Sequence, residues 1–125
     1  MENYDLQRAQ EHFASRVAYT TGVHELEAAV SSAKGGFQVV DVRLPSDFAR
    51  GHVPGAVNLP RGKWQGPALR RDLPVYVYCY DQTCHLAAEA SLELARQGFR
   101  AIEVEGGWER WVQKGFRVET VAAAA

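Results

Sequence analysis

The sequence predicts an α/β fold, with a mostly parallel central sheet flanked by helices on both sides. Two observations predict it. Short apolar runs alternate with longer segments of helical periodicity along most of the 125 residues. The strand-like runs, such as FQVVDVR at 37–43 and VYVYC at 75–79, are apolar almost throughout, as in strands buried on both faces. Alternating strands and helices favour parallel pairing through helical crossovers.

The predicted elements follow in this order. Helices are expected at about 3–14, 21–34, 46–51, 84–97 and 108–114. Strands are expected at 16–20, 37–43, 56–59, 75–79 and 101–104. Residues 61–73 contain two glycines and a proline and show little periodicity, so they are expected to form mainly a loop.

Caps and stops support the helix assignments. Thr21 and Ser46 are suitable N-caps for the second and third helices. Glycines favour the ends of four helices: Gly35 with Gly36, Gly51, Gly98 and Gly115. A Pro-Gly turn precedes the strand at 56–59.

Length and composition suit one domain over residues 1–125, with a helix at about 3–14, a core at about 17–117 and a frayed tail at 121–125. The net charge is −1, from 14 basic and 15 acidic residues, and gives no basis for nucleic acid or an anionic membrane as partner. No apolar run is long enough to span a bilayer. The first residues lack the features of a signal peptide, so a cytoplasmic protein with reduced thiols is expected.

Both cysteines, Cys79 and Cys84, lie in VYVYCYDQTCHLAAEA, where a predicted strand meets a predicted helix. Two cysteines are too few for a disulfide framework or a structural zinc site, so no metal is expected. Turn amides and the helix N-terminus can gather positive potential around Cys79, which would lower its pKa and bind an anionic group. This geometry suits nucleophilic chemistry. Alternatively, Cys79 is a buried cysteine that acts as a small hydrophobe.

Other segments identify a resemblance. VVDVRLPSDFARGHVPGAVNLP at 39–60 closely resembles the N-terminal signature of rhodanese-like domains. VYVYC resembles the family's strand into its active-site cysteine, and GFRAIEVEGGWERWVQKGF at 98–116 resembles its closing segment. The similarity covers about residues 17–117 in the family's order and spacing.

The resemblance implies a sulfurtransferase of the thiosulfate sulfurtransferase type. Such an enzyme moves a sulfane sulfur from thiosulfate or a persulfide to a thiol, cyanide or an acceptor protein. The carrier would be a persulfide on Cys79, with no metal or organic cofactor. The loop at 80–85 would bind the anion through its amides; its residues are Tyr80, Asp81, Gln82, Thr83, Cys84 and His85.

The loop departs from the family's common Cys-Arg-x-Gly-x-Arg pattern. Tyr80, Gln82 and Cys84 stand where that pattern has arginine, glycine and arginine, and Asp81 adds a negative charge. Thiosulfate is a dianion, so it should bind less well unless a basic residue elsewhere reaches the pocket. The candidates are Arg43, Arg61 and Lys63, and Trp64 is expected to border the cleft. Phosphatase and arsenate-reductase relatives need arginine six positions after the cysteine, where this chain has His85, so those activities are not expected.

Cys84 has two interpretations. It is either a resolving thiol, which closes a disulfide with Cys79, or a small residue that begins a helix. The first interpretation allows an alternative function, a redox-responsive regulatory or interaction module. His52 is expected to be structural, and Asp41 and Arg43 to form ion pairs at a strand end. Trp108 and Trp111, three positions apart, are expected to pack on the core.

Overall fold

A computed structural model describes residues 3–65 and 68–121 of the protein. Its centre is a five-stranded sheet in the order β1-β5-β4-β2-β3, and every neighbouring pair is parallel. The strands are β1 (Thr20–Gly22), β2 (Gln38–Asp41), β3 (Val57–Asn58), β4 (Pro74–Tyr78) and β5 (Arg100–Glu105). The predicted α/β class with a mostly parallel sheet is therefore confirmed.

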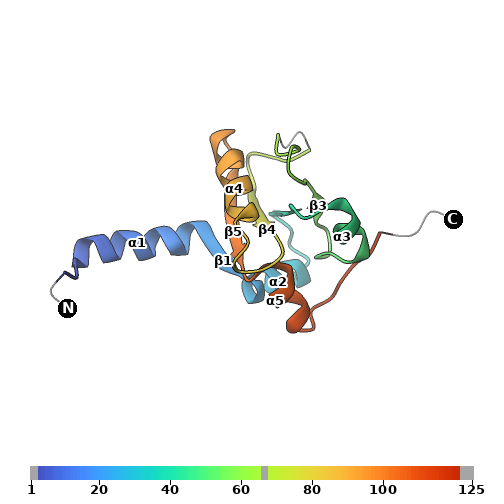
Figure 1. Ribbon diagram of the computed structural model, residues 1–125, viewed down its shortest axis with the longest axis horizontal. Coiled ribbons are helices and arrows are strands. Elements are labelled where there is room, and N and C mark those ends of the chain that lie inside the picture. The colour runs from blue at the N-terminus through green and yellow to red at the C-terminus, as the bar shows by residue number, and fades with distance from the viewer. Residues whose placement is uncertain (1–2, 66–67, 122–125) are drawn as a thin grey trace.

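Helices cover both faces of the sheet (Figure 1). They are α1 (Leu6–Tyr19), α2 (Val23–Ser31), α3 (Pro45–Arg50), α4 (Leu86–Arg96) and α5 (Gly107–Gln113). On one face, Ala87, Ala90 and Leu94 of α4 pack on alternate valines of β2 and β4. On the other face, Leu26 of α2 and Trp111 of α5 pack with the intervening strand residues. No helix in the described parts of the chain is long and apolar enough to cross a membrane.

The strand register brings chemically distinct residues to one edge of the sheet. Asp41 at the end of β2 lies beside Tyr78 at the end of β4. On the other side of β4, Val77 lies beside Glu103, two residues before the end of β5. Because all strands are parallel, the loops that leave β2, β4 and β5 share this carboxyl edge, which is where parallel α/β sheets bind ligands.

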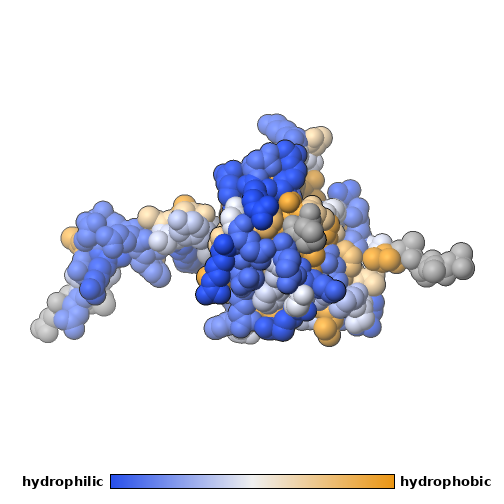
Figure 2. Space-filling model, turned by 90° about the horizontal axis from the view of Figure 1, so that it is seen from above, coloured by the Kyte–Doolittle hydropathy of each residue, from blue (hydrophilic) through white to orange (hydrophobic). Residues whose placement is uncertain are grey.

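The first helix differs from the prediction. Residues 16–19 of the expected strand RVAYT belong to α1, and only Thr20 belongs to a strand, the three-residue β1. Asp5 caps α1 by accepting from the Arg8 amide, and the Thr20 amide closes the last turn by donating to the Arg16 carbonyl; the Arg16 side chain pairs with Glu105 at 3.3 Å. Most of α1 stands away from the sheet, as Figures 1 and 2 show from two directions.

Two predicted caps are also wrong. The N-cap of α2 is Gly22 rather than Thr21, because Thr21 is paired with Val104 in the sheet. The N-cap of α3 is Leu44, and Pro45 occupies the first helical turn, where its missing N–H costs nothing. Of the expected frayed tail at 121–125, residues 122–125 lie outside the described residues.

Candidate active site

Cys79 is the first residue after β4, at the carboxyl edge of the sheet. Its side chain belongs to the core beneath α4, and the residue is only 2% exposed. The following residues, 80–85, lead into α4; we call them the Cys79 loop. The helix begins at Leu86 with His85 as N-cap, two residues later than predicted.

The Cys79 sulfur meets both donors and acceptors. Its thiol donates to the carbonyl oxygen of Cys84 at 3.4 Å and more weakly to that of Asp81 at 3.9 Å. The backbone amides of Tyr80 and Ala87 are directed at the sulfur and favour its anion. The sulfur therefore lies in a mixed cradle, rather than in the purely amide-lined one that the sequence suggested.

Burial and, to a smaller extent, the Cys84 side chain raise the pKa of the Cys79 thiol to about 12. The two amides act in the opposite direction, but their effect is smaller. The prediction of a lowered pKa is therefore wrong for this arrangement. The physical reason is that a thiolate with little access to water loses its hydration, and this loss outweighs the favourable amide dipoles.

The Cys79 loop is held in a tight turn by Asp81. The Asp81 carboxylate accepts from the amide of Thr83 at 3.0 Å and from its hydroxyl at 2.8 Å. The Asp81 carbonyl accepts from the amide of Cys84 at 3.3 Å. These bonds fold the chain back, so that Cys84 returns toward Cys79. The Asp81 side chain thus fixes the turn and adds negative charge beside the sulfur.

The segment that begins α5 fixes the base of this loop. The amide of Trp108 donates to the Cys79 carbonyl and that of Glu109 to the Tyr80 carbonyl, both at 2.8 Å. A Cβ at Gly107 would lie 2.7 Å from the Cys79 carbonyl oxygen, and φ at Gly107 is +58°. Glycine is therefore required at this position for two reasons: a Cβ would clash with the carbonyl oxygen, and the positive φ disfavours any other residue.

Gln82 ties the outer part of the Cys79 loop to the same segment. Its side-chain oxygen accepts from the Gly106 amide at 2.5 Å, and its side-chain nitrogen donates to Glu105 at 3.2 Å. Sequence reasoning did not assign this role to Gln82 or to the Gly-Gly pair. The available signal was two consecutive glycines directly after a strand, which indicates a close backbone approach.

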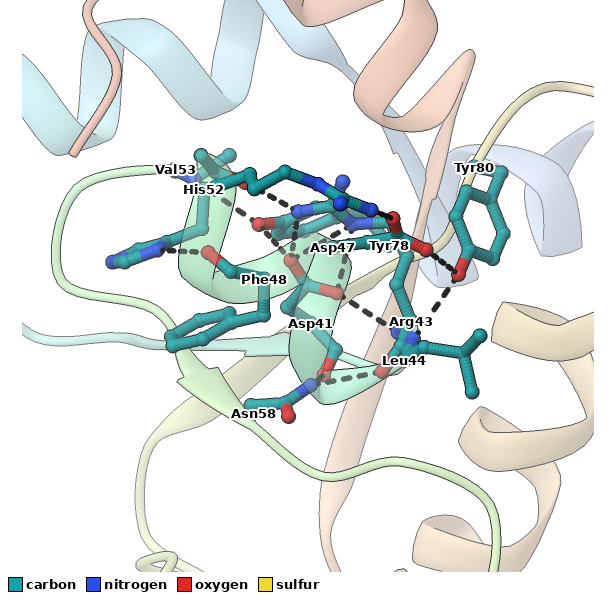
Figure 3. A network of polar contacts seen from close by, with 12 residues as sticks. Asp41, Arg43, Leu44, Asp47, Phe48, His52, Val53, Asn58, Tyr78 and Tyr80 are labelled. Atoms are coloured by element: carbon teal, nitrogen blue, oxygen red, sulfur yellow. Dashed lines mark hydrogen bonds and ion pairs between the residues drawn. The ribbon is translucent and has the colours of Figure 1, made fainter. Parts of the chain in front are cut away.

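A buried ion pair lies beneath the neighbouring strand end (Figure 3). Arg43 binds the Asp41 carboxylate at 2.7 Å and the Gly51 carbonyl at 2.6 Å. The Tyr78 hydroxyl donates to Asp41 at 2.6 Å, and burial beside that carboxylate raises the pKa of Tyr78. We call Asp41, Arg43 and Tyr78 the strand-end network. It agrees with the structural role expected for Asp41 and Arg43.

The structure corrects the expectation that Arg43 reaches the pocket, and it defines the role of the Tyr80 side chain. Arg43 is 2% exposed and its guanidinium lies 4.5 Å from the ring centre of Trp108, so it does not line an open pocket. The Tyr80 side chain extends to α3, where its hydroxyl donates to Asp47 at 2.5 Å and accepts from the Leu44 amide (Figure 3). Tyr80 can therefore serve an anion through its backbone only.

The other candidate residues lie on the α4 side. Arg61 pairs with Glu89 at 2.6 Å and stacks on Trp64, with 5.4 Å between guanidinium carbon and ring centre. Trp64 is half-buried against the core and donates to the Leu59 carbonyl at 2.8 Å. His85 is exposed at the start of α4 and lies near Glu103.

Two tryptophans and a histidine lie around the site. Trp111 is buried in the core as predicted, while Trp108 is partly buried over Arg43. The Nδ1–H of His52 donates to the Phe48 carbonyl at 2.8 Å, and the imidazole ring stacks on Phe48, as its expected structural role requires. Within residues 3–65 and 68–121, no three His, Cys, Asp or Glu side chains are grouped to hold a metal ion.

Comparison with known proteins places this geometry in context. The family model for the rhodanese-like domain matches residues 23–114. The Bacillus subtilis protein YqhL is 32% identical over 102 residues, which span 79% of this chain and 76% of YqhL. Thiosulfate sulfurtransferase GlpE of Stutzerimonas stutzeri is 33% identical over 88 residues, or 68% of this chain and 79% of GlpE. The crystal structure of BH2092 from Bacillus halodurans superposes with a TM-score of 0.86 at 28% identity, covering 94% of this chain and 88% of that one.

Proposed function

The chain belongs to the rhodanese-like domain family, and we propose that it is a sulfurtransferase that carries a sulfane sulfur as a persulfide on Cys79. The observation that carries this proposal is the position of Cys79. It follows β4 at the carboxyl edge of a parallel sheet, with the amides of Tyr80 and Ala87 directed at its sulfur. Those amides would stabilise the anion of a persulfide, whose outer sulfur extends beyond the buried thiol.

Access to Cys79 requires the Cys79 loop to move. In the structure the thiol is buried and donates to two carbonyl groups, which favours its protonated, unreactive form. Displacing the Cys84 and Asp81 carbonyls would expose the sulfur and leave its amide donors in place. The base of the loop is held by α5, so the movement must involve residues 81–85 and break the Gln82 contacts with Gly106 and Glu105.

The charges around the loop bear on the choice of donor. Asp81 lies in the loop and Glu103 lies in β5, while Glu105 at the end of β5 is paired with Arg16. Arg43 is neutralised by Asp41 and Arg61 by Glu89. An organic persulfide carries at most one negative charge, whereas thiosulfate is a dianion, so the persulfide fits this surrounding better. We therefore propose that persulfide-type donors load Cys79 faster than thiosulfate does.

The test is intact-protein mass spectrometry after incubation with thiosulfate, an organic persulfide and inorganic polysulfide. Parent and Cys79→Ser chains are treated in parallel, and donors are removed before measurement. A gain of about 32 Da, one sulfur atom, is expected only when Cys79 is present. If neither the parent nor a Cys84→Ser chain gains this mass with any donor, and no sulfur passes to cyanide or a thiol, the proposed activity is wrong.

A second candidate function, a redox-responsive module, is favoured by two free thiols in one loop. It predicts that peroxide produces a Cys79–Cys84 disulfide in the parent chain. If a Cys84→Ser chain loses thiol titre under peroxide at the parental rate, the second thiol is not part of such a switch. The cytoplasm is the compartment that we propose for either function, because both require reducible thiols.

A further inference from the structure

We propose that Cys84 resolves the Cys79 persulfide, so that sulfur leaves as sulfide and a dithiol reductant is the partner that resets the protein. This inference rests on the proposed persulfide at Cys79. It assigns a chemical role to the residue that replaces a basic position of the family pattern. It also replaces direct transfer to an external thiol with an internal step.

The backbone geometry places Cys84 within reach. The Cys84 carbonyl oxygen is 3.4 Å from the Cys79 sulfur. The Cα of Cys84 is two covalent bonds from that oxygen, so it lies at most roughly 6 Å from the Cys79 sulfur. A cysteine side chain spans a large part of that distance, and the Cys84 side chain already interacts with the Cys79 sulfur, whose pKa it raises. The turn held by Asp81 maintains this proximity.

The two thiols also differ in their access to solvent. Cys79 is buried, whereas Cys84 is half-buried and packs at the border of the same apolar cluster. The loop carbonyls that contact the Cys79 sulfur include that of Cys84 itself, so Cys84 is next to the inner sulfur of a persulfide formed there. Cys84 is consequently the thiol nearest in the chain to any persulfide formed there, while an external thiol first has to displace the loop.

The reaction balances without a further oxidant. The Cys84 thiolate attacks the inner sulfur, Sγ of Cys79, and the bond from Sγ to the outer sulfur breaks. The products are a Cys79–Cys84 disulfide and hydrosulfide, which takes up the proton from the Cys84 thiol. Cys84 is oxidised and the transferred sulfur is reduced. Hydrosulfide leaves readily because hydrogen sulfide is more acidic than an alkyl thiol. A dithiol then reduces the disulfide and becomes a disulfide itself.

The experiment follows the mass of the protein after one loading step. Parent and Cys84→Ser chains are treated with inorganic polysulfide, freed of donor and kept without reductant. The parent should lose its added sulfur at least roughly tenfold faster than the variant, because a held thiol acts at high effective concentration. The parent mass should end about 2 Da below that of the reduced chain, with sulfide released, while the variant keeps its gain of about 32 Da.

Each alternative outcome has a distinct meaning. Equal retention of the added sulfur by parent and variant would overturn the role of Cys84 and leave the persulfide on Cys79 standing. Failure of every chain to gain sulfur would overturn the proposed function, and this inference with it. A Cys84→Ala chain repeats the test without a hydroxyl, so that an effect of serine itself is recognised. Peptide mapping of the parent product must place the disulfide between residues 79 and 84.

Discussion

Two polar clusters share the carboxyl edge of the sheet, and their interactions differ in kind. In the strand-end network, the Arg43 guanidinium binds the Asp41 carboxylate and a backbone carbonyl, and the Tyr78 hydroxyl donates to the same carboxylate. In the Cys79 loop, the buried thiol meets carbonyl groups as well as amides. Tyr80 and Cys84 stand where the family pattern has arginine. The charged and polar groups of the strand-end network have their hydrogen-bond partners in the structure. The Cys84 and Asp81 carbonyls, by contrast, accept from Cys79 only while its thiol is protonated.

We therefore expect the strand-end network to support the fold and the Cys79 loop to carry the chemistry. The strand-end network fixes the ends of β2 and β4 and supports Trp108, whose amide binds the Cys79 carbonyl. The loop, by contrast, changes its preferred arrangement as soon as its sulfur is charged or modified. We expect substitutions in the network to act mainly on folding, and substitutions in the loop or against it to act mainly on sulfur chemistry.

The largest expected effect is that of Arg43→Met. It keeps part of the side-chain volume but leaves the buried Asp41 carboxylate without its cation, which should lower the free energy of unfolding by about 3–5 kcal/mol. Urea denaturation measures this loss. Arg61→Met is the matched control, because Arg61 also pairs with a carboxylate and stacks on a tryptophan, but 65% of its side chain is exposed. The control should change stability by less than about 1 kcal/mol.

A further variant isolates the cause of that loss. Adding Asp41→Asn to Arg43→Met removes the unpaired charge and retains an oxygen that can accept from Tyr78. It should recover part of the stability. If the double variant is as unstable as the single one, the loss arises from packing around Arg43 and not from the buried carboxylate.

The next effect is that of Gly107→Ala. The new Cβ would lie against the Cys79 carbonyl, and the positive φ adds strain, for a cost of about 1–3 kcal/mol. Gly115→Ala is its control, because Gly115 has φ +71° but nothing within 4 Å of an added Cβ. Gly107→Ala should reduce the rate of persulfide formation on Cys79 under conditions where both variants are folded. Equal loading by both variants would show that the α5 contact does not position the loop.

The smallest effect at neutral pH concerns the protonation of Cys79. The raised pKa means that folding favours the thiol, a contribution present below the pKa of the unfolded chain and lost as pH rises toward about 12. In a Cys84→Ser chain, alkylation of Cys79 by iodoacetamide should therefore be slow at neutral pH and still increase above pH 9. A rate that levels off near neutral pH would show that the loop already holds a thiolate.

The sequence was most informative where a single residue pattern indicated a single strand or helix. The near-continuous apolar runs correctly indicated buried parallel strands, and the strand–cysteine–loop–helix order located the candidate site at the carboxyl edge. It failed where a local preference competed with a distant contact. RVAYT looked extended, yet the Arg16–Glu105 pair belongs to the end of a continuous helix. Thr21 was a suitable N-cap by residue type, but its backbone is paired with Val104 in the sheet.

The residue types and their order were enough to predict the fold class, because it depends on apolar period and glycine positions. The resemblance of three motifs to rhodanese-like domains indicated the family and the cysteine proposed to carry sulfur. The state of that cysteine was decided by tertiary structure. Its burial under α4, the carbonyls of Asp81 and Cys84, and the approach of Gly107 come from segments whose relative placement no local pattern contains. Desolvation depends on all of them together, which is why a loop that should have lowered the pKa of Cys79 raises it.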